Sequence, residues 1–327
     1  MPLFHRESAE EKQQRENALA AADLEAQLQE KSKQALLAGK LPVRAQERVA
    51  EIREAIDSGA GVPLFGSDLS VNEFLLARQL GYEPVGLVAG SCIYHIGWNS
   101  WTYTGVLDNQ TEALFVATTS AISRLKLEAL GMGALGVVGV RLEIRKPTWG
   151  ESLIEVVALG TAIHARGAPA HAEPFVGGLS AQEYCAMLQT GSRPVGLVFG
   201  NCAYYIYTSY QDQMQNLSWY NQEVVKYTQA VYDAQRHAFG RMHRQAESAR
   251  AHGVIGVHFD HTLRRIASGG SDNEREDYIV EYIAWGTAII EAPAHTKIRT
   301  PEMVVDLEDL ARTARLTPGS QKGELTR

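Results

Sequence analysis

The sequence predicts an α+β protein built as a tandem duplication: two copies of a β-α-β-β unit, each led by a short helix, behind a helical N-terminal extension. Three observations support this. LSVNEFLLARQLGYEPVGLVAGSCIYHI recurs without a gap as LSAQEYCAMLQTGSRPVGLVFGNCAYYI, which places Cys92 and Cys202 in matching positions 110 residues apart. The pattern G-[VI]-[VI]-G-V follows in both halves, and both halves close on a strand ending in G-T-A-I. One repeating unit therefore accounts for most of the chain.

The spacing between matched segments grows along the chain. It is 117 residues between Gly136 and Gly253, and 126 residues between Gly160 and Gly286. The second copy therefore carries two insertions, one near residues 211–222 and one in the turn-forming stretch SGGSDNERE. The predicted organisation is a helical extension at 1–62, repeat 1 at 63–168, repeat 2 at 174–292, and a C-terminal tail with one helix at 293–327.

Each repeat opens with a signal for a short helix. A Ser-x-x-Glu capping box places one hydroxyl and one carboxylate on the free N–H groups of the first turn. A glycine then ends the helix, because it tolerates the left-handed conformation. The boxes are Ser70-x-x-Glu73 and Ser180-x-x-Glu183, and the stops are Gly81 and Gly191.

The remaining elements follow in the same order in both copies. A strand around each cysteine comes first, then a helix, near 112–130 in repeat 1 and 224–251 in repeat 2. Two strands then form a hairpin, GVVGVRLEI with LIEVVALGTAI and GVIGVHFDH with YIVEYIAWGTAI.

The regions outside the repeats read as helical. Ser8-x-x-Glu11 is a capping box, Gly39 is a stop, and Pro42 opens a second helix at 44–56. The first helix has only a thin apolar stripe, which predicts an exposed or partner-bound helix. The C-terminal helix is expected at 301–316.

Composition excludes several classes of protein. The net charge of −7 gives no basic field for nucleic acid or an anionic membrane, and no stretch is apolar enough to span a bilayer. The N-terminus lacks the apolar core of a secretory signal. Three widely spaced cysteines favour reduced thiols in the cytoplasm.

With the motifs in view, the chain resembles the YbjQ-type family, often labelled "putative heavy-metal-binding". The residues that carry the resemblance are the strand elements Gly90-Ser-Cys and Gly200-Asn-Cys, the helix pairs Arg124-Leu125 and Arg241-Met242, and the G-[VI]-[VI]-G-V and A-x-G-T-A-I strands. The resemblance covers about 64–290 and implies a small β-α-β-β (dodecin-like) unit. It also implies assembly into five-fold rings.

The candidate metal ligands are cysteine and histidine with one carboxylate, a donor set that suits a divalent transition metal. No other cofactor is indicated. Cys92 and Cys202 recur at matching strand positions, where a buried hydrophobic role is the alternative. On a strand, His258 and Asp260 share one face and His261 points to the other, so a shared metal would need a bend or a second subunit. The candidates are Cys92, Cys202, His258, Asp260 and His261.

Aromatic residues cluster after each cysteine and predict a ligand pocket or partner surface, with packing at the edge of the sheet as the alternative. The candidates are Tyr94, His95, Trp98, Trp101, Tyr204, Tyr205 and Tyr207.

The hairpin strands predict self-association. Val157 and Leu159 lie on one face of the last strand of repeat 1 while apolar residues also fill the other face, and Ile283 and Trp285 repeat the pattern. Each repeat has one long helix to cover one face, so the other must meet the sister repeat, the N-terminal helices or another subunit. We expect these four residues at an interface between chains in a homo-oligomer, for which the resemblance implies a five-fold ring.

No acid, base and nucleophile recur together, so no catalytic residue is assigned. The function that the sequence favours is a non-enzymatic, oligomeric binding or scaffolding protein of unknown ligand. The N-terminal helices are expected to offer a surface to a protein partner. Two alternatives stay open: a heavy-metal-binding protein with sites between repeats or subunits, and a cysteine-dependent enzyme using Cys92 or Cys202 with His95.

Overall fold

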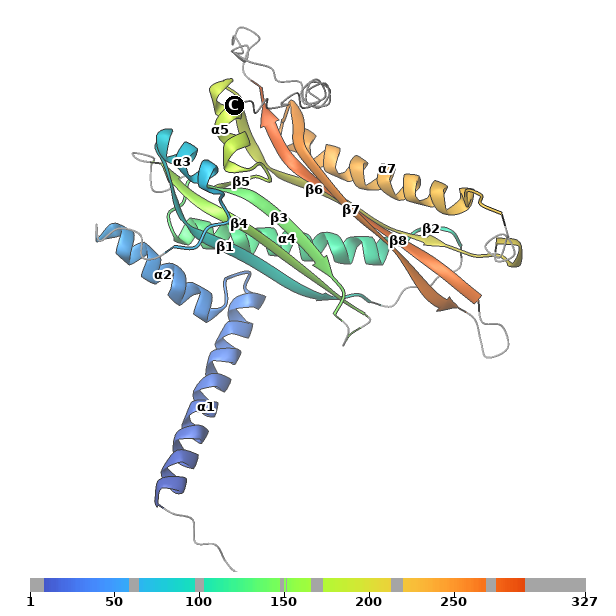
Figure 1. Cartoon of the computed structure of the whole chain (residues 1–327). Helices are drawn as coiled ribbons and strands as arrows, with labels where there is room; N and C mark the ends of the chain where they lie inside the picture. Colours follow the sequence, from blue (N-terminus) through green and yellow to red (C-terminus); the bar gives the residue numbers. More distant parts are fainter. Residues whose placement is uncertain are drawn as a thin grey trace, which may run out of the picture. The chain divides into compact units, whose positions relative to one another are not determined.

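A computed structural model describes residues 9–58, 65–97, 103–147, 150, 152–165, 173–212, 220–268 and 275–291. The predicted tandem α+β fold is confirmed (Figure 1). The box at Ser8 and the helix expected at 301–316 lie outside the described residues, as do Trp98 and Trp101.

The elements follow the predicted order. The extension forms α1 (Ala9–Leu37) and α2 (Val43–Asp57). Repeat 1 comprises α3 (Val71–Gln79), β1 (Tyr82–His95), β2 (Gly105–Val106), α4 (Asp108–Gly131), β3 (Gly136–Arg145) and β4 (Leu153–Ala165). Repeat 2 comprises β5 (Phe175–Val176), α5 (Ala181–Gln189), β6 (Arg193–Ile206), α7 (Val225–Ser248), β7 (Gly253–Ser268) and β8 (Arg275–Ile290).

Two four-stranded sheets result, and each borrows one short strand from the other repeat. Sheet A has the order β1-β4-β3-β5, in which β5 pairs parallel to β3. Sheet B has the order β2-β6-β8-β7, in which β2 pairs antiparallel to β6. Cys92 lies opposite Val156 and Cys202 opposite Tyr282, which confirms the same register in both copies.

The leading helices begin and end where the sequence indicates. Both capping boxes form in full: Glu73 N–H donates to Ser70 Oγ at 3.3 Å, and Ser70 N–H donates to the Glu73 carboxylate at 2.7 Å. The second box has the same bonds. Gly81 and Gly191 follow the helices with φ of +83° and +80°.

The G-[VI]-[VI]-G-V pattern encodes a β-bulge. The register of β3 shifts between Val138 and Arg141, and Gly139 within the shift has a φ of +65°. Gly256 has a φ of +58° at the matching shift of β7. The second glycine of the pattern is therefore required by a left-handed backbone.

Each long helix packs closely on the sheet of its own repeat. A Cβ on Gly90 would lie 1.9 Å from the carbonyl oxygen of Ala121, and a Cβ on Gly200 would lie 1.9 Å from that of Ala238. These glycines let α4 approach β1 and α7 approach β6. We call the face of each sheet that meets its own helix the inner face, and the opposite one the outer face.

The N-terminal extension divides into a packed and an exposed helix. In α2, Val49 is buried and belongs to the core around α4, and Arg48 donates to Glu128 at 2.6 Å. The described side chains of α1 are largely exposed, as the sequence predicts. Gly39 has a φ of +71° between the two helices. No helix among the described residues is long and apolar enough to cross a bilayer.

Candidate functional site: the seam between the repeats

Helix α4 lies between two sheets (Figure 1). One side carries Ala117, Ala121 and Leu125, all fully buried, toward the inner face of sheet A. The other side meets the outer face of sheet B, where the Phe115 ring lies 5.1 Å from that of Phe199. We call this contact of α4 and β3 with the outer face of sheet B the seam.

Hydrogen bonds fix α4 to β6 across the seam. The Ala203 N–H donates to Thr111 Oγ1 at 2.9 Å, and Asn201 Nδ2 donates to the Thr111 carbonyl at 2.6 Å. The Leu107 N–H, just before the helix, donates to the Ala203 carbonyl at 2.8 Å. Thr111 and Ala203 are buried, so these bonds satisfy groups that cannot reach water.

A polar cluster closes one end of the seam. Glu281 on β8 accepts hydrogen bonds from Lys146 Nζ and Gln110 Nε2, and both donors come from repeat 1. The Lys146 and Glu281 side chains are 22% and 15% exposed. Burial lowers the pKa of Lys146 and nearby Arg264 adds to the effect, while Glu281 opposes it.

Two of the four residues expected at an interface between chains are instead buried at the seam within one chain. Ile283 and Trp285 are buried to 4% and 9% exposure within the chain, in the same cluster as α4 and β3. They meet the sister repeat, one of the alternatives weighed above, so they cannot bind another chain. Val157 and Leu159, at the matching positions of β4, are only half-buried.

A groove of about 440 Å³ opens at the same end of the seam. Both repeats line it: α4, β3 and β4 on one side, and β7 and β8 on the other. Asp260 and His261, two of the candidate metal ligands, stand on its β7 wall.

The structure does not bring the candidate metal ligands together. His258 stacks on Trp285 and His261 on Tyr282, across opposite faces of sheet B. Cys92 and Cys202 lie in the separate cores of the two repeats. Within the described part of the chain, no group of three or more His, Cys, Asp or Glu side chains could hold a metal ion.

The cysteines sit in apolar surroundings. Cys92, Cys185 and Cys202 are free and buried. Burial raises the pKa of Cys202 to about 12, which disfavours the nucleophilic thiolate. His95 is exposed at the end of β1, three positions beyond Cys92 and thus on the opposite side of the strand from its thiol.

The aromatic candidates separate into different environments. Tyr205 is fully buried and its hydroxyl donates to Asp277 at 2.6 Å, so it belongs to the core and to no ligand surface. Tyr94 and Tyr207 are 36% and 37% exposed. Tyr204 is half-buried, and its hydroxyl donates to Asp233 at 3.4 Å.

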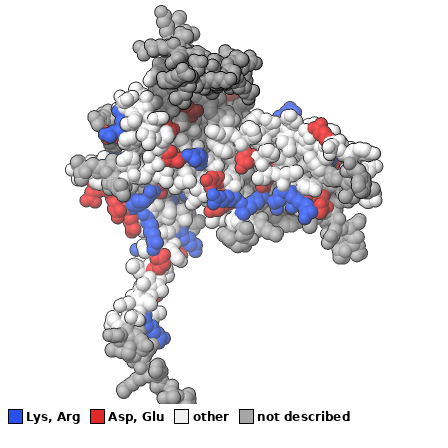
Figure 2. All heavy atoms as spheres, viewed as in Figure 1, with Lys and Arg blue, Asp and Glu red and all other residues white. Residues whose placement is uncertain are grey.

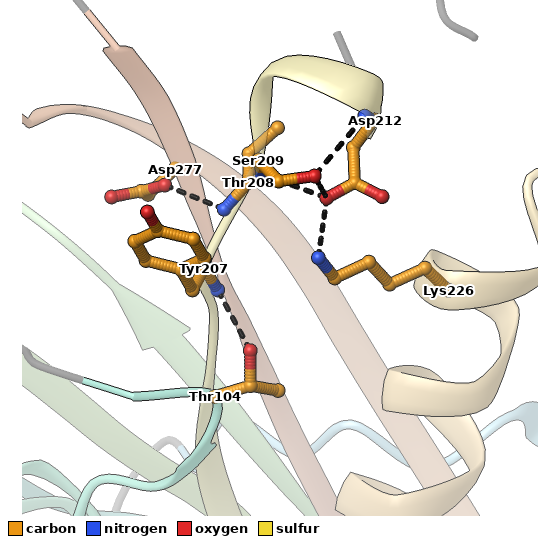
Figure 3. Close-up of polar contacts among 7 residues, drawn as sticks. All are labelled: Thr104, Tyr207, Thr208, Ser209, Asp212, Lys226 and Asp277. Carbon is orange, nitrogen blue, oxygen red and sulfur yellow. Dashed lines mark hydrogen bonds and ion pairs between the residues drawn. The ribbon is translucent and has the colours of Figure 1, made fainter.

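A polar network holds the chain after β6 (Figure 3). The Thr208 N–H donates to buried Asp277 at 2.7 Å. Ser209 and Lys226 both donate to the Asp212 carboxylate, and the Tyr207 N–H donates to Thr104 of repeat 1. The network fixes the end of strand β6, because its donors and its two carboxylates bond to one another.

Sequence reasoning missed the polar residues of the seam. A usable signal was present for one of them: Thr111 recurs in α7 as Thr228, at the same spacing of 117 residues as the bulge glycines. Glu281 recurs as Glu155 at the spacing of 126 residues, but its partner left no such signal, because Leu263 replaces Lys146 in the other copy.

Comparison with protein families matches the family described as "Putative heavy-metal-binding", YbjQ, at residues 101–166 and 189–291. The chain belongs to the YbjQ family. Together the two matches cover about half of the chain, one in each repeat, as the internal duplication requires.

Two relatives are informative. Encapsulin nanocompartment protein Rv1762c of Mycobacterium tuberculosis is 35% identical over 256 residues, which cover 75% of this chain and 92% of that protein. UPF0145 protein NP_2600A of Natronomonas pharaonis is 47% identical over 62 residues, 19% of this chain and 58% of that protein. No solved structure gives a significant match.

Proposed function

We propose that this protein is a non-enzymatic scaffold that assembles with itself, head to tail, by repeating its internal seam between neighbouring chains. The observation that carries the proposal is the asymmetric use of two equivalent repeats. The seam uses the helix side of repeat 1 and the outer sheet face of repeat 2. Each repeat has both a helix side and an outer sheet face. The helix side of repeat 2 and the outer sheet face of repeat 1 therefore take no part in the seam of their own chain.

The unused helix side belongs to repeat 2. Tyr232 on α7 and Phe259 on β7 are 63% and 59% exposed. Thr228 is half-exposed, and Val257 is 40% exposed. Their counterparts in repeat 1 all lie in the seam: Phe115, Leu142, Thr111 and Val140.

The unused sheet face belongs to repeat 1. Leu87 and Ile93 are 39% and 53% exposed, and Val157 and Leu159 are half-buried beside them. Their counterparts on the outer face of sheet B are Leu197, Ala203, Ile283 and Trp285. Apolar side chains on both unused surfaces suit a contact with a second copy, because exposed apolar patches mark interaction sites.

The edges of the two sheets also differ in whether a short strand covers them. In the chain, Phe175 and Val176 pair with the edge of β3 at Gly136 and Val137. The corresponding edge of β7 has no partner strand among the described residues. Phe65, the counterpart of Phe175, stacks on Phe74 at 6.2 Å as Phe175 stacks on Tyr184 at 4.9 Å. Phe65 and its neighbour could therefore pair with β7 of the next chain.

A head-to-tail contact generates a closed ring or an open filament. The family resemblance favours a ring, and a relative named for an encapsulin nanocompartment supports a role in assembly. The exposed length of α1 remains available to a protein partner. Three buried, unpaired cysteines suit the reducing cytoplasm.

Light scattering on dilute protein tests the proposal. We expect a multiple of 35.9 kDa at micromolar concentration. Tyr232→Glu and Ile93→Glu, one on each unused surface, should give monomers with an unchanged far-UV circular-dichroism spectrum, which shows that the fold is kept. Leu24→Glu on exposed α1 is the matched control and should keep the wild-type mass. A wild-type mass of 35.9 kDa, or equal masses for all three variants, would overturn the proposal.

A further inference from the structure

The groove at the end of the seam has walls of two kinds. Its floor and sides are mostly apolar, with Leu114 and Ile154 from repeat 1 and Ile283 from repeat 2. Four basic side chains and two acidic ones surround this apolar part. The basic residues are Arg145, Lys146, Arg264 and Arg265, and the acidic ones are Asp260 and Glu281.

The lining of the groove holds more basic than acidic side chains, and acidic partners just outside it pair with two of the basic ones. Figure 2 shows Lys and Arg side chains in a run across the region where the end of β3 lies near β7 and β8. The chain as a whole carries a net charge of −7, so a basic groove departs from its average surface. Arg145 pairs with Glu143, and Arg265 pairs with Glu276 at 2.7 Å.

Arg264 differs from these neighbours. The described part of the chain offers it no ion-pair partner, and its Nε is buried without a hydrogen-bond partner. Lys146 lies close enough for the positive charge of Arg264 to lower the pKa of the lysine. Glu281 is already occupied by Lys146, Gln110 and, at 3.4 Å, the Thr262 hydroxyl. A buried guanidinium N–H without an acceptor is costly, so an anionic acceptor would be stabilised here.

We infer that this groove binds a small organic anion with an apolar body, such as a medium-chain carboxylate, with its charged end on Arg264 and its chain along Leu114 and Ile283. The volume of 440 Å³ and the mostly apolar lining are typical of sites for small molecules. A neutral ligand would leave the guanidinium unpaired, and a cation would be repelled by it.

The site is restricted to the seam inside each chain. Its wall residues Lys146 and Leu114 correspond to Leu263 and Val231, so a seam between chains would lack the lysine. The inference does not rest on self-assembly, because one chain supplies both walls of the groove.

Calorimetric titration with decanoate tests the site, with decanol and decyltrimethylammonium as probes that change only the charged end. We expect saturable binding of one decanoate per chain, and at least tenfold weaker binding of the other two. Arg264→Gln should weaken decanoate binding at least tenfold, and Arg264→Lys should restore part of it. Arg236→Gln, on an exposed position of α7, is the matched control and should bind like the wild type.

A second variant tests the apolar part of the groove without removing a charge. Thr262→Trp places a large ring at the exposed rim and should weaken decanoate binding while the thermal stability is kept. Equal affinities for decanoate and decanol, equal effects of Arg264→Gln and Arg236→Gln, or no saturable binding to the folded wild type would each overturn the inference.

Discussion

The hydroxyl of Thr111 accepts a hydrogen bond of 2.9 Å from the backbone N–H of Ala203, which joins a helix of repeat 1 to a strand of repeat 2. Thr228 stands at the equivalent position of α7, half-exposed and facing no third repeat. Thr111 thus makes a hydrogen bond between the two repeats of one chain. Thr228 is half-exposed and available for the equivalent hydrogen bond to another chain.

Thr111→Val and Thr228→Val should therefore have different effects. Thr111→Val leaves the buried Ala203 N–H without an acceptor, which lowers the free energy of unfolding by about 1–3 kcal/mol. Thr228→Val should change the stability of a dilute chain by less than about 0.5 kcal/mol. It should weaken self-association instead. Denaturant unfolding and sedimentation measure the two effects, and equal loss of stability in both variants would contradict this reading of the seam.

Gly200→Ala should destabilise the protein strongly. The new methyl group would lie 1.9 Å from the backbone carbonyl of Ala238, and neither the strand nor the helix can yield without breaking other packing. We expect a loss of about 1–3 kcal/mol or more from overpacking. Gly196→Ala on the same strand has open space around its Cβ and is the control. Thermal unfolding of both variants checks the difference.

Substitutions of Lys146 and Glu281 should have strongly non-additive effects on the free energy of unfolding. Lys146→Met leaves Glu281 without its cation in a half-buried site, and breaking such a pair costs on the order of 3 kcal/mol. The double variant Lys146→Met with Glu281→Gln should recover much of that loss, because no charge is left unpaired. A double-mutant cycle by denaturant unfolding measures the coupling energy, and additive effects would show that the pair is effectively solvated.

Asp212 should make the stability depend on pH in the acidic range. Burial raises the pKa of Asp212, but hydrogen bonds from Lys226 and Ser209 outweigh it, and the net shift is downward. Its carboxylate therefore contributes stability above the pKa of the unfolded chain, and this contribution is lost as the pH falls through the folded-state pKa. Asp212→Asn should lower the melting temperature at pH 7, with the difference from wild type shrinking toward pH 3. A difference independent of pH would contradict the network of Figure 3.

Cys202 should be unreactive in the folded protein. With a pKa of about 12, only about one thiol in ten thousand is ionised at pH 8. Labelling with a disulfide reagent, followed by mass spectrometry to locate the label, should be slow until denaturant is added. Fast labelling of native Cys202 would support the cysteine-dependent enzyme that the sequence left open.

Local signals predicted each repeat well. Capping boxes at Ser70 and Ser180, and glycine stops at Gly81 and Gly191, act within a few residues and need no knowledge of the rest of the fold. The strand containing the G-x-x-G pattern was also predicted, although the bulge at Gly139 was not. Such a bulge depends on the residue-by-residue register of β3 against β4, which the sequence pattern did not specify although it predicted the hairpin.

The seam could not be read from the sequence, because identical patterns in the two repeats have different neighbours. Leu159 and Trp285 occupy the same strand position and both indicate a covered face. Only the fold reveals that Trp285 is buried within the chain, in one core cluster with α4 and β3, while Leu159 lies half-buried. The orientation of one repeat on the other, which decides the difference, is a long-range property.

The borrowed strands and the seam also change what a mutation does to this protein. In an assembly of single units, any substitution appears at every contact at once. Here Lys146 meets Glu281, whereas the corresponding contact between chains would place Leu263 near Glu155. Covalent linkage gives the internal contact an effective concentration in the millimolar range, so it forms even when the external one is weak. The two contacts are therefore free to diverge in sequence, and one can acquire a new property while the other continues to hold the assembly together.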